Sequence, residues 1–245
     1  PYIRESLARI TPDVVYIRGS EIVASDVRDA DALIVRTRTY CNRELLEGSR
    51  VQFVATATIG IDHLDTQWLD EAGIHWVNCP GCNASSVGQY IETSLMRLGF
   101  NSGIVGIVGC GHVGSEVKAV CESMGLKTIV NDPFIDDPTF VPIEDVMTYA
   151  DIITFHVPLT RCGSHPTWHL ADKAFFSHLY ELRSCPIECI INTSRGGVID
   201  EQALLNAMDE GIVGNAVIDT WEGDPEINSE LLRRAFIAPP HIAGY

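Results

Sequence analysis

The sequence has few basic residues, no long apolar run and no dense pattern of cysteines. Its 245 residues include 17 lysines and arginines against 33 aspartates and glutamates, a formal net charge of −16. Nucleic acids and anionic lipids are bound mainly by Lys and Arg that neutralise phosphates, so this balance argues against both as partners. It also means that an anionic substrate can be held only where the scarce arginines converge.

Long apolar stretches and targeting signals are absent as well. No run reaches the roughly 18–20 residues of a membrane-spanning helix. No basic segment followed by an apolar one opens the sequence, so we expect neither a membrane span nor a secretory signal. The eight cysteines lack the regular spacing of a secreted disulfide scaffold, which indicates reduced thiols in a cytoplasmic protein.

Two cysteine pairs stand close in the sequence, Cys79-Pro80-Gly81-Cys82 and Cys185 with Cys189. The first pair has the spacing of a redox motif or of half a zinc site. However, no second Cys/His pair follows at the distance found in zinc fingers. A simple turn is therefore the favoured interpretation, and we expect no metal site.

Short runs rich in Val, Ile and Ala alternate with segments of helical period, as in doubly wound α/β proteins. Most of the runs are almost continuously apolar, as expected of strands buried on both faces of a parallel sheet. The expected strands are Ala32–Val35, Val51–Ala55, Ile104–Val108, Thr128–Val130, Ile152–Phe155, Ile187–Ile191 and Ala216–Ile218. The expected helices are Asp65–Ala72, Ser85–Leu98, Val113–Met124 and Glu201–Asp209.

The long helix that ends before Gly99–Gly103 marks the expected domain boundary. We expect two Rossmann-like lobes with parallel sheets, a flavodoxin-like lobe over residues 1–84 and a nucleotide-binding lobe over residues 85–240. Residues 241–245 would begin a return to the first lobe.

A phosphate-binding turn is predicted directly after the strand Ile104–Val108. The sequence Gly109-Cys110-Gly111-His112-Val113-Gly114 has the G-x-G-x-x-G spacing and opens a helix. The first glycine allows the turn, the second lets the backbone approach a pyrophosphate, and the third lets helix and strand pack closely. Eighteen residues after Gly114, Asp132 follows the next strand, where an acidic side chain meets the ribose hydroxyls of NAD. It would repel the 2′-phosphate of NADP, so we expect NAD to be the cofactor.

Three polar patches follow later strands, at the edge where open α/β sheets bind ligands. They centre on Arg195, on the carboxylates Glu222 and Asp224, and on His241. Taken singly, each residue is most simply a surface or packing group. Together they supply what oxidation of a hydroxy acid requires: a guanidinium that grips the carboxylate, an imidazole that takes the hydroxyl proton, and a carboxylate that orients the imidazole.

These motifs resemble the D-isomer-specific 2-hydroxyacid dehydrogenases over essentially the whole chain. The resemblance is carried by the segments 109–114, 192–197, 219–225 and 240–244. Further segments restrict the resemblance to one group of enzymes within the family. They are Val35-Arg36-Thr37, Ala55 to His63, Pro80 to Ala84, and His169-Leu170-Ala171-Asp172. It implies NAD-dependent oxidation of a small phosphorylated 2-hydroxy acid by a homodimer.

The resemblance also assigns roles to individual residues. Arg195 falls on the carboxylate-binding catalytic position, His241 on the acid–base position, and Asp224 on the position of the family's catalytic Glu. Substrate contacts are implied for Arg36, Thr37, Thr58, Asn83 and Tyr245. Cofactor contacts are implied for Gly109, Gly111, His112, Val113, Gly114, Asp132, Val157, Asp219 and Gly244.

The sequence departs from the family pattern at several points. Asp224 is one methylene shorter than the usual Glu, and His156-Val157-Pro158 offers no hydroxyl contact in the cofactor loop. The family's first strand and its C-terminal dimerisation portion are not part of this sequence. Two alternatives stay open: another D-2-hydroxyacid dehydrogenase, acting on 3-phosphoglycerate or glycerate, and an NADH-sensing protein of the corepressor type, since such proteins keep the same catalytic residues.

Overall fold

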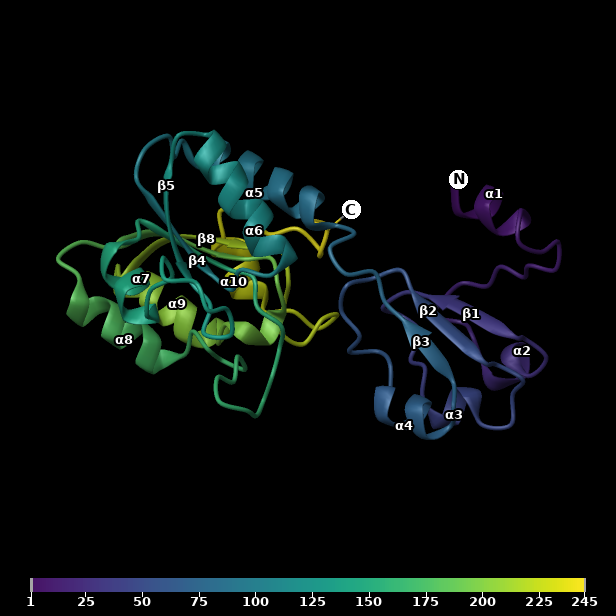
Figure 1. The fold of residues 1–245 in the computed structure, drawn as a ribbon. Coiled ribbons are helices and arrows are strands. Elements are labelled where there is room, and N and C mark those ends of the chain that lie inside the picture. The colour runs from purple at the N-terminus through teal and green to yellow at the C-terminus, as the bar shows by residue number, and fades with distance from the viewer. Residues whose placement is uncertain (1, 245) are drawn as a thin grey trace. The chain divides into compact units, whose positions relative to one another are not determined.

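A computed structural model describes residues 2–244, so Pro1 and Tyr245 are outside the described residues. The chain divides into two compact units, the first ending at Cys82 and the second beginning at Asn83 (Figure 1). Each unit contains its own parallel sheet. The α/β class with two parallel sheets, expected from the alternating sequence pattern, is therefore confirmed.

Unit 1 contains a three-stranded parallel sheet in the order β1-β2-β3. Its strands are β1 (Ala32–Val35), β2 (Phe53–Thr56) and β3 (His75–Val77). Its helices are α1 (Tyr2–Ala8), α2 (Ala24–Val27), α3 (Arg43–Leu46) and α4 (Thr66–Glu71). Strand β1 has the predicted bounds, whereas β2 begins two residues later than predicted and β3 was not predicted. None of the three residues of β3 is buried, so no apolar run marks it.

Unit 2 contains a five-stranded parallel sheet in the order β5-β4-β6-β7-β8. Its strands are β4 (Ile104–Val108), β5 (Lys127–Asn131), β6 (Ile152–Phe155), β7 (Ile187–Asn192) and β8 (Val213–Ile218). Strand β5, which follows β4 in the chain, lies on one side of β4 in the sheet, and the next strand, β6, lies on its other side. The strand order therefore reverses between β4 and β6, and ligands of open α/β sheets bind beyond the carboxyl ends of the strands at such a point.

The helices of unit 2 are only partly predictable from the sequence. Helix α9 (Glu201–Asp209) has the predicted bounds, α5 (Ala84–Leu98) begins one residue earlier than predicted, and α6 (His112–Ser123) is shifted by one residue at both ends. Three further helices were not predicted: α7 (Ile143–Tyr149), α8 (Lys173–Leu182) and α10 (Ser229–Arg234). A short 3-10 turn, η1, spans Gly196–Val198.

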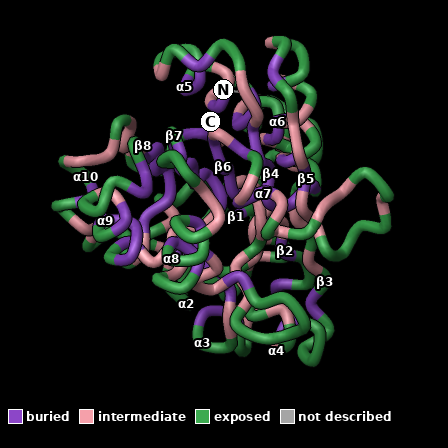
Figure 2. The backbone as a smooth tube through the Cα atoms, turned by 90° about the vertical axis from the view of Figure 1, so that its left-hand side faces the viewer, coloured by how far each residue is buried: buried purple, intermediate pink, exposed green. Residues whose placement is uncertain are grey.

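The core of unit 2 lies on both faces of its sheet. Because side chains alternate along a strand, Ile191 packs with the residues of α5 and α6, whereas its neighbour Ile190 packs with those of α7, α8 and α9. The central strands are buried almost throughout (Figure 2). This double burial explains why their sequences read as continuous apolar runs.

No helix among residues 2–244 is both long enough and apolar enough to cross a membrane.

Candidate active site

The glycine-rich turn between β4 and α6 has the close packing that its spacing predicts. A side chain at Gly114 would collide with the carbonyl oxygen of Gly109, so helix and turn can meet only with glycine there. Gly109 has a φ of 90°, and a Cβ on it would lie 2.5 Å from the carbonyl oxygen of His156. The turn thus touches the loop after β6 at the point where the strand order reverses.

Gly111 differs from the other two glycines because nothing lies within 4 Å of the position its Cβ would take. No packing within the protein therefore explains the glycine, and the open space lies at the start of α6. This helix begins at His112, and its N-cap residue Gly111 provides no side-chain cap for the first N–H groups. Uncapped N–H groups beside open space fit a pyrophosphate, which makes the turn a suitable cradle for NAD.

Asp132 is tied to this turn by its carboxylate. One carboxylate oxygen accepts a hydrogen bond from the backbone N–H of Cys110 at 2.8 Å, and the other accepts from Phe134 N–H at 3.0 Å. Asp132 follows β5, which lies beside β4. The carboxylate is therefore fixed next to the cradle, where the ribose of a bound dinucleotide is expected.

Replacing Asp132 with Asn is expected to lower the preference for NAD over NADP by about 10-fold. The amide oxygen can still accept from the turn, but the charge that repels a 2′-phosphate is lost. Fluorescence titration with NADH and NADPH measures both dissociation constants. An unmodified protein that binds NADPH more tightly than NADH would contradict the role given to Asp132.

Three buried polar atoms lie near the end of β8 without a hydrogen-bond partner among the described residues: Asn83 Oδ1, Tyr90 Oη and Thr220 Oγ1. Thr220 follows Asp219, and the Asn83 side chain lies against Gly244. Burial, together with the charge of Asp219, raises the pKa of Tyr90. Buried polar groups are normally satisfied, so these atoms indicate a place for a polar ligand or water beside Asp219.

Asp219 holds the backbone after His241. Its buried carboxylate accepts from Ile242 N–H at 2.7 Å and from Ala243 N–H at 3.0 and 3.1 Å. Burial raises the pKa of Asp219, while these two N–H groups and the nearby charge of His241 lower it. His241 itself is exposed and has a φ of 56°, an unusual conformation for a residue with a side chain. Asp219 thus fixes the turn that presents the imidazole.

Arg195 lies just after β7 in a loop held by close packing. Its carbonyl oxygen accepts from the Asn192 side-chain amide at 2.9 Å, and its guanidinium donates to the Ser194 carbonyl at 2.7 Å. A side chain at Gly196 would collide with the backbone of Trp221, and one at Gly197 with the ring of Trp168. Gly196 therefore brings the Arg195 loop against the loop that carries the candidate carboxylates, and Gly197 brings it against the ring of Trp168.

Glu222 and Asp224 are placed differently. Both carboxylate oxygens of Glu222 lie 3.0 Å from Nε2 of His169, and its backbone N–H donates to the carboxylate of Glu201 at 2.8 Å. Asp224 is exposed, and within residues 2–244 no hydrogen bond or ion pair joins His241 to either carboxylate. Glu222 is thus engaged by His169, whereas no hydrogen bond or ion pair of the Asp224 side chain is found among residues 2–244.

His169 is a residue of this region whose contact the sequence reasoning missed. It has a φ of 51°, stacks on Trp168 at 4.4 Å between ring centroids and lies 3.9 Å from the carboxylate of Asp200. The sequence identifies the segment His169–Asp172 only as a family motif. A histidine in that motif and a carboxylate 53 residues later give no signal of pairing in a single sequence.

The loop after β6 adds a second histidine. His156 shares hydrogen bonds with the hydroxyl groups of Thr154, at 2.9 Å, and Thr193, at 3.4 Å, which joins the ends of β6 and β7. Burial lowers the pKa of His156 to about 3, so it is neutral near pH 7. The next residue, Val157, lies against Gly109 and lines the predicted cofactor loop with an apolar surface.

The predicted substrate residues of unit 1 follow β1 and β2. Arg36 and Thr37 are exposed directly after β1. Thr58, after β2, bonds the Gly60 carbonyl at 2.8 Å and the Thr56 hydroxyl at 2.6 Å, and Thr56 in turn bonds His63 at 2.8 Å. Tyr245, the remaining predicted substrate contact, lies outside the described residues.

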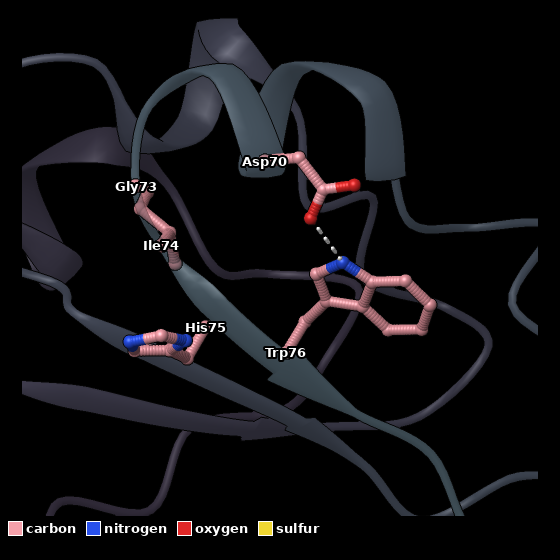
Figure 3. A pocket seen from close by; sticks show the side chains of 5 residues that line it. All are labelled: Asp70, Gly73, Ile74, His75 and Trp76. Carbon is pink, nitrogen blue, oxygen red and sulfur yellow. Dashed lines mark hydrogen bonds between the residues drawn. The ribbon is translucent and has the colours of Figure 1, made fainter.

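An open pocket in unit 1 is lined by Asp70, Gly73, Ile74, His75 and Trp76 (Figure 3). There the indole N–H of Trp76 donates to the carboxylate of Asp70 at 3.0 Å and ties α4 to β3. The pocket contains none of the predicted site residues. Among residues 2–244, no group of three His, Cys, Asp or Glu side chains could hold a metal ion.

Residues 85–243 match the family described as D-isomer specific 2-hydroxyacid dehydrogenase, NAD binding domain. The matched range includes the glycine-rich turn, Asp132, the Arg195 loop and His241. NAD is therefore the cofactor that the cradle fits.

Whole-chain relatives have a more specific name. The chain is 48% identical over 255 aligned residues to the erythronate-4-phosphate dehydrogenase of Bacteroides thetaiotaomicron, covering all of this chain and 72% of that protein. The protein of the same name from Escherichia fergusonii is 42% identical, and the alignment covers 100% of this chain and 66% of that protein. A solved NAD+-bound 3-phosphoglycerate dehydrogenase from Entamoeba histolytica has a TM-score of 0.80 at 29% identity, covering 98% of this chain and 82% of that chain.

Proposed function

Because the chain belongs to the D-isomer-specific 2-hydroxyacid dehydrogenase family, we propose that it oxidises 4-phospho-D-erythronate to 2-oxo-3-hydroxy-4-phosphobutanoate with NAD+. This reaction belongs to pyridoxine and pyridoxal phosphate biosynthesis. The observation that carries the proposal is the 42–48% identity, over the whole chain, to relatives named for this activity.

The residues of unit 2 divide the chemistry among them. Bound NAD+ supplies the hydride acceptor for the hydrogen on C2 of the hydroxy acid. Arg195 binds the substrate carboxylate in a two-pronged grip and fixes C2 in place. His241 takes the proton of the C2 hydroxyl as the carbonyl forms, and Asp224 stabilises the imidazolium that results.

The residues of unit 1 supply the specificity for a phosphorylated substrate. Arg36 and Arg38 flank Thr37 after β1 and concentrate positive charge in a chain whose net charge is −16. We assign Arg36, Thr37 and Thr58 to substrate binding, residues 1–84 to the substrate domain and residues 85–240 to the NAD domain.

A panel of hydroxy acids tests the proposed substrate. We expect kcat/KM for 4-phospho-D-erythronate to exceed that for unphosphorylated D-erythronate by about 10²-fold, because a charge-assisted phosphate contact is worth roughly 1.5–3 kcal/mol. D-Lactate, glycerate and 3-phosphoglycerate complete the panel, with NADH formation followed at 340 nm. Equal rates with 4-phospho-D-erythronate and D-lactate would reject the substrate while leaving the family unchanged. A preference for 3-phosphoglycerate would favour the activity for which the Entamoeba protein is named.

We extend the proposal to a homodimer in the cytoplasm. The eight cysteines lack the dense, regular spacing of a secreted disulfide scaffold, which supports a reducing compartment. The dimer follows from the family resemblance, and a monomeric mass in sedimentation analysis of the full-length protein would contradict it.

A further inference from the structure

Cys79 and Cys82 are both exposed and lie at the two ends of one tight turn. The backbone N–H of Cys82 donates to the carbonyl of Cys79 at 3.2 Å, and Gly81 has a φ of 73°. Proline at the second position and glycine with positive φ at the third define a type II turn, whose end Cα atoms lie less than about 7 Å apart. A disulfide requires about 4.4–6.8 Å, so the backbone already has a suitable span.

The two thiol groups also interact with each other. Burial raises the pKa of Cys82, and Cys79 raises it further through its charge and a side-chain hydrogen bond. The positive charge of Arg36 lowers the pKa of Cys82. The two thiol groups thus belong to one turn, and the charge of a proposed substrate residue, Arg36, reaches Cys82.

The turn is joined to the segment after β2. Cys79 N–H donates to the carbonyl of Thr58 at 3.0 Å, and the Asn78 side chain donates to the carbonyl of Ile59 at 2.8 Å. A change in the turn would therefore act on Thr58 and on the surroundings of Arg36.

We propose that Cys79 and Cys82 are a redox modification site that closes to a reversible disulfide by exchange with a small disulfide such as oxidised glutathione. The Cys79 thiolate attacks one sulfur of glutathione disulfide, forms a mixed disulfide and releases one glutathione thiolate. The Cys82 thiolate then attacks the Cys79 sulfur and releases the second glutathione. Two thiols of the protein are oxidised, one glutathione disulfide is reduced to two glutathiones, and no other reactant is required.

The consequence rests on the proposed function of unit 1. Closing the disulfide draws the Cys82 sulfur toward Cys79 and constrains the turn bonded to Thr58. We expect the KM for the hydroxy acid to rise by about fivefold, comparable to the loss of one hydrogen bond. The dissociation constant for NAD should stay the same, because the hydrogen bonds of the turn go to the segment after β2 and not to the glycine-rich turn or Asp132.

The site is tested by equilibrating the purified protein with glutathione buffers from fully reduced to fully oxidised. Free thiols are alkylated, and the peptides are mapped by mass spectrometry. We expect Cys79 and Cys82 to lose their labels together as an internal disulfide, while the exposed Cys162 and Cys185 stay reactive or carry separate glutathione adducts. Continued labelling of Cys79 and Cys82, or a glutathione on each, would overturn the proposal whatever the enzyme's substrate.

Two variants test the effect on the enzyme. Cys79→Ser should remove both the disulfide and the oxidative rise in KM, and its activity in reduced buffer should match that of the unmodified protein. Cys162→Ser removes another exposed thiol and should keep the oxidative rise. If oxidation raised the KM of Cys79→Ser equally, the link between this turn and substrate binding would be wrong.

Discussion

Replacing His241 with Asn is expected to lower kcat by about 10²- to 10⁴-fold, the usual contribution of a positioned acid–base group. Asparagine retains polarity and similar size but cannot accept the hydroxyl proton near neutral pH. The dissociation constant for NADH should change little, since among residues 2–244 neither the glycine-rich turn nor Asp132 hydrogen bonds to His241. Steady-state kinetics at saturating NAD+ and fluorescence titration measure the two effects.

His178 provides a matched control because it is an exposed histidine on α8 of the same unit. His178→Asn should keep normal kcat.

The same kinetic assay distinguishes the two candidate carboxylates, Glu222 and Asp224. Asp224→Asn should reduce kcat more than Glu222→Gln, because Glu222 is paired with His169. Normal turnover of His241→Asn would remove this histidine from the catalytic set, and a larger loss in Glu222→Gln would move the carboxylate role to Glu222.

Replacing Arg195 with Lys is expected to reduce kcat/KM by about 10²-fold or more while the protein stays folded. Lysine keeps the charge but is a point cation and cannot make two parallel hydrogen bonds to a carboxylate. One lost charge-assisted contact corresponds to roughly 1.5–3 kcal/mol. Because the guanidinium of Arg195 also donates to the Ser194 carbonyl, a thermal unfolding curve is needed beside the kinetics.

Arg233→Lys is the matched control, since Arg233 is exposed on α10 and donates to the backbone of its own helix. We expect it to leave both kinetics and unfolding temperature unchanged. Near-normal kcat/KM in Arg195→Lys would show that no two-pronged grip is made at this position.

The strands of unit 2 could be predicted because burial on both faces leaves few polar residues in them. The prediction for β8 covered only Ala216–Ile218, whereas the strand begins at Val213. Gly214 and Asn215 weaken its local pattern, and pairing with β7 extends the strand past them. In unit 1, the expected start of β2 at Val51 was wrong, since the strand begins at Phe53. Such boundaries depend on neighbouring strands, which a single sequence does not display.

Helix α8 was not predicted, although its sequence contains a helix-start signal. Its N-cap Asp172 accepts a hydrogen bond from Phe175 N–H at 2.9 Å, as expected of an aspartate that begins a helix. Asp172 also ends the motif His169-Leu170-Ala171-Asp172, and only this family likeness was used for the prediction. The cap and the apolar residues Phe175, Phe176 and Leu179 together could have predicted the helix.

The cradle could be predicted from the sequence because its function depends on consecutive residues in a strand–turn–helix unit. The contacts of Asp132 with Cys110 and of Asp219 with Ile242 required the fold, since the partners are 22 and 23 residues apart. The substrate and catalytic roles of the predicted residues stay predictions until the variants are measured.

Isotope transfer tests the central claim most directly. The protein is incubated with NAD+ and 4-phospho-D-erythronate that carries deuterium at C2, and the NADH formed is analysed by mass spectrometry and NMR. Because the hydrogen on C2 moves as a hydride, we expect deuterium at C4 of the nicotinamide in stoichiometric amount, together with one equivalent of the 2-oxo acid. Formation of no NADH, or of NADH without deuterium, would contradict the assignment of this chain as a dehydrogenase acting at C2 of that acid.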